Sequence, residues 1–246
     1  MYFKDINCSK FEFKQSRQKF SVDELNKAIE NADDSRVLEI LGSDRELSFK
    51  NDSKGISPLT KNYRTTNNIL IENMLLCADE RVFKFKIYTL DVLADKNVSE
   101  SKTIKILNQL FDEGLDKSAV FYYEDFGLLN AALAGEKVEV FDYLLDKNCL
   151  ISDRLGMDIW VSFTKIFRDE NIALNIKTPR SKELINLLNS QKYKTHRTFW
   201  LNLTEKVVEK GLNPNNLNYL YTTFKYLGDE NSMKKLQNLG YKNDVK

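Results

Sequence analysis

The chain has 246 residues, of which 42% are hydrophobic and 30% are charged. This composition supplies a core and a well-solvated surface, and it excludes an intrinsically disordered chain. Lys and Arg number 37 against 36 Asp and Glu, so the basic excess typical of duplex-DNA binders is absent and direct nucleic-acid binding is not expected. Three prolines and nine glycines are too few for a β-sandwich with frequent turns, which favours helices.

Charged residues interrupt every apolar pair of the N-terminal segment, and no apolar run of the chain is long enough to span a membrane. The cysteines are odd in number and far apart, at Cys8, Cys77 and Cys149. This pattern predicts a reduced protein without disulfides, located in the cytoplasm. We expect Cys77 and Cys149 to fill space in the core.

Residues 1–20 are predicted to form an N-terminal arm. Phe3, Phe11, Phe13 and Phe20 alternate with Lys and Glu, which is consistent with either a short strand or an arm packed across the first helices. A first pair of helices then follows, with these apolar positions: Ala28, Ile29, Ala32, Val37, Leu38 and Leu41.

A turn and a helix start are predicted at residues 52–60. Gly55 permits a tight turn, Ser57 can cap a helix, and Pro58 suits the first helical position. A second helix is indicated by an apolar stripe at Leu70, Ile71, Met74 and Leu75.

The same arrangement returns after Asp125. Ala131 and Ala132 allow neighbouring helices to approach closely, and Gly135 breaks the first helix at a position expected to need a positive φ. Asn148 is expected to take the left-handed conformation that closes the second helix. The apolar positions of that second helix are Val138, Val140, Phe141, Leu144 and Leu145.

These two stretches resemble the ankyrin repeat, a β-turn and two antiparallel helices over about 33 residues. The first is similar to the family's G-x-T-P-L-H start, with Ser57 and Thr60 in place of Thr and His. The second is similar to its A-A-x-x-G hinge, with one extra residue after Gly135. Looser versions of the repeat's ending and helices lie at residues 110–116, 207–215 and 228–240.

The resemblance implies an all-α fold, an α-solenoid of stacked helix pairs. Residues 21–246 are predicted to form one solenoid domain of about five to six degenerate repeats. After Asn148 the pattern loosens, with helices predicted at 158–167, 181–189 and 198–210 and an insertion at 168–179. A generic α-solenoid of helix pairs is the alternative.

His196 is the only histidine, and it lies in the polar stretch Lys192–Arg197, predicted to be a solvated loop. No second histidine, C-x-x-C spacing or phosphate-binding glycine motif accompanies it, so no catalytic residue, metal or cofactor is predicted. A ribonuclease can work with one histidine, a lysine and a tyrosine. An RNA-processing enzyme that uses Lys192–Arg197, with Tyr193 stacking on a base, is therefore an alternative.

Two predicted turns combine aromatic and charged side chains, with Met157 among them. The eight candidate protein-binding residues are Tyr122, Tyr123, Glu124 and Asp125 in one turn, and Asp153, Arg154, Asp158 and Trp160 one repeat later. Exposed Tyr, Trp and Arg carry most of the affinity in many protein interfaces. The alternative is that Phe121 and Trp160 cover helix ends in an irregular repeat.

In the ankyrin family the turns and first helices bind proteins, so the resemblance implies a non-enzymatic protein-binding module. Bacterial immunity proteins paired with secreted toxins include ankyrin-like members. The first hypothesis is therefore an immunity protein, monomeric before binding, that neutralises a cognate toxin domain such as a nuclease by direct binding. The alternative is an ankyrin-type effector or scaffold that binds a host protein.

Overall fold

The computed structural model describes residues 7–15, 17–122, 126–175 and 179–242, without the side chains of residues 83, 84, 87 and 122. Helix accounts for 67% of the chain, which confirms the predicted all-α class. The chain divides into two compact units, Met1–Leu150 and Ile151–Lys246. The sequence predicts one domain over residues 21–246, whereas the boundary between the two compact units falls inside this range, after Leu150.

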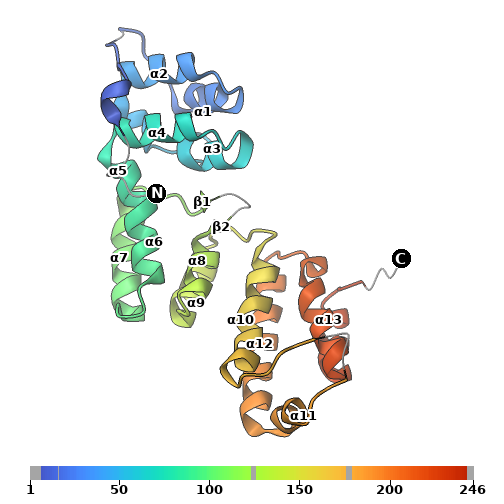
Figure 1. Ribbon diagram of the computed structural model, residues 1–246. Coiled ribbons are helices and arrows are strands. Elements are labelled where there is room, and N and C mark those ends of the chain that lie inside the picture. The colour runs from blue at the N-terminus through green and yellow to red at the C-terminus, as the bar shows by residue number, and fades with distance from the viewer. Residues whose placement is uncertain (1–6, 16, 123–125, 176–178, 243–246) are drawn as a thin grey trace. The chain divides into compact units, whose positions relative to one another are not determined.

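Short helices joined by tight turns build the first unit (Figure 1). Its α-helices are α1 (Val22–Glu30), α2 (Asp34–Ser43), α3 (Pro58–Thr65), α4 (Ile69–Ala78), α5 (Glu80–Phe83), α6 (Thr89–Ala94), α7 (Glu100–Asp112), α8 (Leu128–Ala134) and α9 (Val138–Asp146). The 3-10 helices η2 (Cys8–Lys10) and η3 (Arg45–Ser48) and the π-helical segment η4 (Lys84–Tyr88) join them. Strands β1 (Val120–Tyr122) and β2 (Phe126–Gly127) form an antiparallel ribbon.

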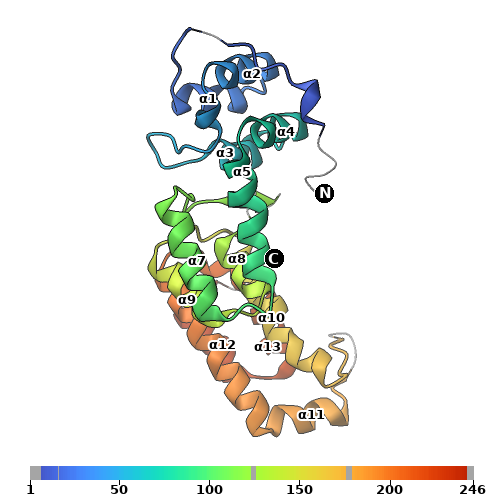
Figure 2. The same ribbon diagram turned by 90° about the vertical axis from the view of Figure 1, so that its left-hand side faces the viewer.

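The helices of the first unit pack pair against pair. Helix α1 packs on α3 and α2 on α4, and both Figure 1 and Figure 2 show the pair α1–α2 beside the pair α3–α4. In the same way α6 packs on α8 and α7 on α9. One helix pair cannot bury its own apolar face, so each pair covers the face of its neighbour.

In three helix pairs of the first unit, α1–α2, α3–α4 and α8–α9, the turn between the two helices contains one residue in the left-handed conformation. Ala32, Asn67 and Glu136 have φ angles of 52°, 46° and 59°, each between the first and second helix of its pair. After α8 the backbone N–H of Lys137 donates to the carbonyl oxygen of Ala132 at 2.9 Å, which closes the last helical turn. The same backbone conformation therefore recurs in these three turns.

The predictions around α3 and after α9 are confirmed. Gly55 has a φ of 76° in the turn before α3. Ser57 caps α3, because its hydroxyl accepts a hydrogen bond from the backbone N–H of Thr60 at 3.3 Å, and Pro58 is the first helical residue. Asn148 follows α9 with a φ of 57°.

Gly135 is required for a reason other than the predicted one. Its φ is −78°, in the helical region, and the positive φ belongs to Glu136, so the predicted reason is wrong. A Cβ added at Gly135 would lie 2.0 Å from the carbonyl oxygen of Leu93 in α6. The backbones of α6 and α8 therefore meet at this point, and only glycine leaves room for that contact.

The core of the α1–α4 layers follows the predicted apolar stripes except at Ala32, which is exposed in the turn between α1 and α2, and at Leu70. Ile71, Met74 and Leu75 of α4 are at most 4% exposed, whereas Leu70 is 40% exposed. Since α4 begins at Ile69, Leu70 lies in its first turn and points away from α2 and α3.

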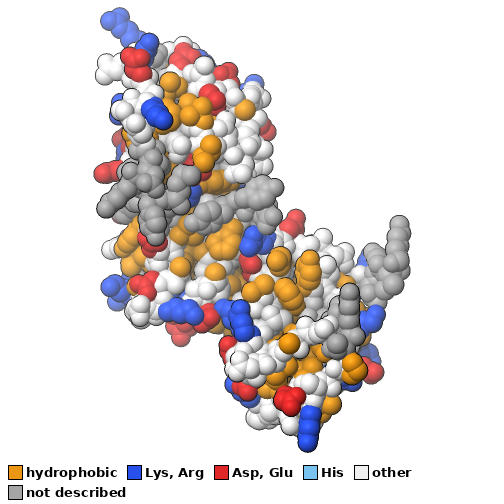
Figure 3. Space-filling view, in the orientation of Figure 1, with side chains coloured by type: hydrophobic (Ala, Val, Ile, Leu, Met, Phe, Trp, Pro, Cys, Tyr) orange, Lys and Arg blue, Asp and Glu red, His pale blue; other side chains and the backbone are white. Residues whose placement is uncertain are grey.

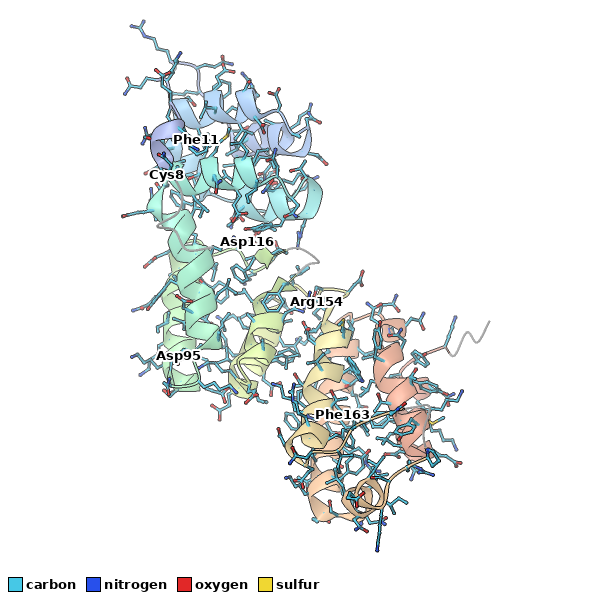
Figure 4. The ribbon with its side chains drawn as sticks, viewed as in Figure 1. Cys8, Phe11, Asp95, Asp116, Arg154 and Phe163 are labelled. Atoms are coloured by element: carbon cyan, nitrogen blue, oxygen red, sulfur yellow. A yellow bond between two sulfur atoms is a disulfide. The ribbon has the colours of Figure 1, made fainter. Side chains whose placement is uncertain are left out.

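The N-terminal arm lies along the first two helix pairs, and its described residues form no strand. Phe11, Phe13 and Phe20 pack against the core of α1–α4, while Phe3 lies outside the described residues. The arm contacts α2 closely, since a Cβ on Gly42 would lie 2.3 Å from a backbone oxygen of the arm. Figure 4 marks the arm at Phe11.

A disulfide joins Cys8 of the arm to Cys77 of α4, so the prediction of a chain without disulfides is wrong. The two residues are 69 positions apart, and only the course of the arm across α4 brings them together (Figure 4). Cys149 is free and 3% exposed, as predicted. Burial raises the pKa of its thiol to about 12, so it stays protonated near neutral pH.

A buried carboxylate connects the α1–α4 layers to the rest of the first unit. Asp116, in the loop after α7, is 5% exposed (Figure 4). Its oxygens accept from the backbone N–H of Ser57 at 3.1 Å and from the backbone N–H and hydroxyl of Ser118 at 2.7 and 2.8 Å. Three donors compensate the desolvation of the charge, so Asp116 ties the start of α3 to the approach to β1.

The second unit contains α10 (Leu155–Asp169), α11 (Lys182–Asn189), α12 (Gln191–Glu209), α13 (Asn218–Leu227) and α14 (Glu230–Asn238), with a 3-10 helix η5 (Pro214–Leu217). Helix α10 packs on α12 and α13, and α13 packs on α14. Its core is aromatic: the ring of Phe163, fully buried, lies 5.1 Å from that of Phe224 and 5.9 Å from that of Phe167 (Figure 4). The helices predicted at 158–167 and 181–189 are present.

We expect Gly135→Ala to lower the free energy of unfolding by at least about 1–3 kcal/mol, the cost of overpacking, because the new methyl group meets the Leu93 carbonyl. The neighbouring Glu136→Gly serves as the matched control. It relieves a positive φ and loses an exposed ion pair with Lys96, so it should destabilise the protein less than Gly135→Ala does. Urea denaturation measures both. A larger loss of stability in Glu136→Gly than in Gly135→Ala would contradict the assignment of the close backbone contact to Gly135.

The disulfide predicts a definite thiol count. The oxidised chain should show one reactive thiol after unfolding, that of Cys149, and three after reduction. Cys8→Ser should destabilise the protein by about 2–4 kcal/mol, because the bond restricts the unfolded chain over a long loop. Thiol titration and thermal melts measure these changes. Adding a reductant to Cys8→Ser should cause no further loss, and a further loss would contradict the assigned pairing.

Candidate functional site

The eight predicted interface residues do not all lie in one compact unit. Tyr122 ends β1 of the first unit, and Tyr123, Glu124 and Asp125 lie outside the described residues. Asp153, Arg154, Asp158 and Trp160 lie in the second unit, at the start of α10. The described residues include the whole second group, and the structure brings its four members together at the start of α10.

The charged residues at the start of α10 contact their own neighbours. The carboxylate of Asp153 accepts a hydrogen bond from the side-chain amide of Asn216 at 2.8 Å. The Nε atom of Arg154 lies 3.5 Å from a carboxylate oxygen of Asp158, one helical turn further on (Figure 4). The Asp153–Asn216 hydrogen bond thus holds the start of α10 against η5, while the Arg154–Asp158 pair lies within α10, with side chains 31% and 16% exposed.

Trp160 is half-buried against α13. Its indole N–H donates to the hydroxyl of Thr223 at 2.9 Å, and its ring centroid lies 5.2 Å from that of Tyr219. Tyr219 is itself 49% exposed. Trp160 therefore packs α10 on α13 and also supports the exposed ring of Tyr219. It has a structural role and contributes to the surface as well.

Apolar side chains gather on the surface around this aromatic pair. Met157 and Val161 are 42% and 37% exposed and lie one turn apart on α10, next to Trp160 in the helix. Together with Tyr219 they form a surface that we call the α10–α13 patch, and Figure 3 shows apolar side chains over these two helices. Sequence reasoning missed Val161 and Tyr219. The spacing of Met157 and Val161, opposite the apolar stripe of α10, is the signal that identifies the exposed side.

The stretch Lys192–Arg197 is helical, so the prediction of a solvated loop is wrong. It forms the first turns of α12, and the hydroxyl of Ser190 caps them by accepting from the backbone N–H of Tyr193 at 3.1 Å. Tyr193 is 2% exposed, and its ring centroid lies 6.0 Å from that of Phe167. Its buried side chain is in no position to stack on a base. Burial also raises the pKa of its hydroxyl, which keeps the proton on the oxygen.

The two outer cations of this stretch are paired. Lys192 forms an ion pair with Glu170, and Arg197 forms one with Asp229 at 3.0 Å. The carboxylate of Asp229 also caps α14, so Arg197 links α12 to the start of that helix. Both cations connect helices of the second unit, which accounts for them without a bound phosphate.

His196 is half-buried and holds α12 against α10. Its Nε2 atom lies 2.8 Å from the carbonyl oxygen of Phe163, and since a carbonyl only accepts, Nε2 carries the proton. The imidazole also packs on Phe163 and Trp200, with ring centroids 5.5 and 6.1 Å away. Burial lowers the pKa of His196 and outweighs the opposing effect of the Phe163 hydrogen bond. The ring is therefore neutral at pH 7, with its donor already used.

The described residues include no cluster of three or more His, Cys, Asp or Glu side chains that would hold a metal ion. Over the same residues, every helix is too short or too polar to cross a membrane.

No protein-family model matches the chain, and no curated protein or solved structure is significantly similar to it. The assignment of function therefore rests on the residues and their geometry.

The buried histidine makes stability depend on pH. Because the pKa of His196 is lowered by folding, the unfolded chain takes up a proton first as the pH falls through about 6.5. The stability contributed by the neutral ring is present above that pH and is lost below it. We expect the melting temperature of the wild type to fall more between pH 7.5 and 5.5 than that of His196→Gln, which retains a donor for Phe163. Parallel pH profiles would mean that His196 is solvated.

Proposed function

We propose that the chain is a non-enzymatic protein-binding module, built as an α-solenoid of ankyrin-like helix pairs. The observation that carries the proposal is the recurrent packing of first helix on first helix and second on second, with Ala32, Asn67 and Glu136 at equivalent turns. Helix pairs that contact only their neighbouring pairs produce an extended surface that is suited to binding another macromolecule.

The groups that a ribonuclease would use support the same proposal. His196 donates to the Phe163 carbonyl, Tyr193 is buried, and Lys192 is ion-paired. Each has a structural role inside the second unit, which disfavours the alternative of an RNA-processing enzyme at this stretch.

We propose further that the partner is a toxin domain and that the chain is its immunity protein. Degenerate repeats favour this, because each helix pair then presents different side chains to one target. Aromatic and basic anchors would be Tyr122, Tyr123, Arg154 and Trp160. The acidic residues around them would meet a basic region of the toxin: Glu124, Asp125, Asp153 and Asp158. An effector or scaffold that binds a host protein is the second candidate.

The proposed location is the cytoplasm, with the chain monomeric before it binds. The Cys8–Cys77 disulfide weighs against this location, because disulfides persist mainly in oxidising compartments. Lysis of the cells directly into denaturant with a thiol-alkylating reagent decides the point: three modified cysteines indicate a reducing compartment, and one, Cys149, indicates an oxidising compartment.

Isolation of the tagged chain from its own cells, with mass spectrometry, identifies the partner for a binding test. We expect Tyr122→Ala, Tyr123→Ala, Arg154→Ala and Trp160→Ala each to weaken binding by about 2 kcal/mol, as hot-spot residues do. Calorimetry measures affinity, and thermal melts separate binding from folding. Trp160→Phe is the control for Trp160→Ala, because it keeps an aromatic ring but loses the Thr223 hydrogen bond.

Unchanged affinity in all four variants would move the interface elsewhere. A nuclease activity that disappears in His196→Ala, with folding intact, would replace the proposed function by the enzymatic alternative.

A further inference from the structure

We propose that the outer face of α10, together with Tyr219 of α13, is a docking surface for an acidic protein segment whose carboxylates surround apolar side chains. The inference rests on the proposed protein-binding function and names the chemistry of the partner that this one surface takes.

One side of α10 is core and the other is surface. The core side carries Leu155, Ile159, Phe163 and Ile166, which are at most 2% exposed. The outer side carries residues at intervals of three or four, which a helix places on one face. These are Arg154, Met157, Val161, Lys165 and Arg168.

The apolar members of the outer face are placed to make contact. Met157 and Val161 are 42% and 37% exposed, and the adjoining ring of Tyr219 is 49% exposed. Trp160 holds that ring in place, because the two centroids lie 5.2 Å apart and the indole is fixed by Thr223. A preorganised aromatic ring loses little conformational freedom when a partner covers it.

Cations surround this apolar centre. Arg154 lies at one end of the face, half-exposed and bridged to Asp158. Arg168 lies at the other end, exposed, and its side chain makes no hydrogen bond or ion pair with any described residue. An apolar centre with a charged rim is the usual composition of a protein interface. Here the rim carries the cations Arg154 and Arg168, with Asp158 paired to Arg154, and its basic character comes from the excess of cations in the whole unit.

The charge of the whole unit has the same sign. Residues 151–246 contain 16 Lys and Arg against 10 Asp and Glu, whereas residues 1–150 contain 21 against 26. The net charge of +1 for the chain thus combines an acidic first unit with a basic second unit. Long-range attraction therefore draws an acidic partner to the second unit.

A protein fits this surface better than a nucleic acid does. Sites for single strands combine aromatic platforms for bases with a continuous track of cations. Met157 and Val161 are aliphatic and offer no stacking surface, and one side of the Tyr219 ring already faces Trp160. Aliphatic contacts with carboxylates around them are what this face can satisfy.

A synthetic amphipathic helix with Leu on one face and Glu on the other is the probe, and the same peptide with Lys for Glu is its comparison. Fluorescence anisotropy of labelled peptides with the full-length chain measures binding. We expect the Glu peptide to bind at least about tenfold more tightly than the Lys peptide, and to weaken as salt rises. Equal binding of the two peptides overturns the proposal.

Two surface variants test whether the Glu peptide binds at the outer face of α10. Val161→Asp and Arg168→Glu should each weaken binding of the Glu peptide by about tenfold or more. Lys234→Glu, an exposed cation of α14, is the matched control and should leave it unchanged. Circular dichroism confirms that each variant folds. An unchanged affinity in Val161→Asp and Arg168→Glu overturns the proposal, as does a single-stranded RNA that binds tighter than the peptide and is lost in Arg168→Glu.

The test of this docking surface can be distinguished from the test of the proposed protein-binding function. A natural protein partner whose affinity is unaffected by Arg168→Glu overturns this surface while the binding function stands. Binding of the Glu peptide in a chain for which no protein partner is found contradicts the proposed function alone.

Discussion

Close contact between helix backbones is the constraint on which the packing depends. At Gly135 an added Cβ would lie 2.0 Å from the Leu93 carbonyl oxygen, and at Gly156 it would lie 2.3 Å from that of Asn216. These contacts set the distance between α6 and α8 and between α10 and η5. Helix pairs brought this close can cover the apolar faces of their neighbours, which no pair can bury alone.

The N-terminal arm and its disulfide complete the first helix pairs. A terminal unit of a stack has one face without a neighbouring pair, and the arm supplies apolar cover through Phe11, Phe13 and Phe20. The bond between Cys8 and Cys77 holds this cover in place. The same bond links the location of the protein to its structure, because a reducing compartment would leave the arm attached by packing alone.

In the second unit some aromatic side chains join helices, whereas other apolar side chains lie at the surface. Trp160, His196 and Tyr193 all join helices, through Thr223, the Phe163 carbonyl and aromatic contacts respectively. The large apolar side chains that lie at its surface include Met157, Val161 and Tyr219 of the α10–α13 patch, and also Ile185 and Phe199. The surface that we propose for binding is therefore a small apolar patch with charged side chains around it.

Local features of the fold could be predicted from the sequence because they depend on neighbouring residues. The cap at Ser57, the turn at Gly55 and the left-handed Asn148 are of this kind, as is the helical class. Only the tertiary structure decided the pairing of Cys8 with Cys77, the helical state of residues 192–197 and the reason for Gly135. In the candidate site, the sequence located Trp160 and Arg154, but the exposure of Val161 and Tyr219 depends on how α10 and α13 pack. The cysteine pairing, the contact at Gly135 and the exposure of Val161 and Tyr219 result from contacts between segments distant in sequence, and neither periodicity nor composition contains that information. The start of α12 depends on the local cap at Ser190 and on the burial of Tyr193.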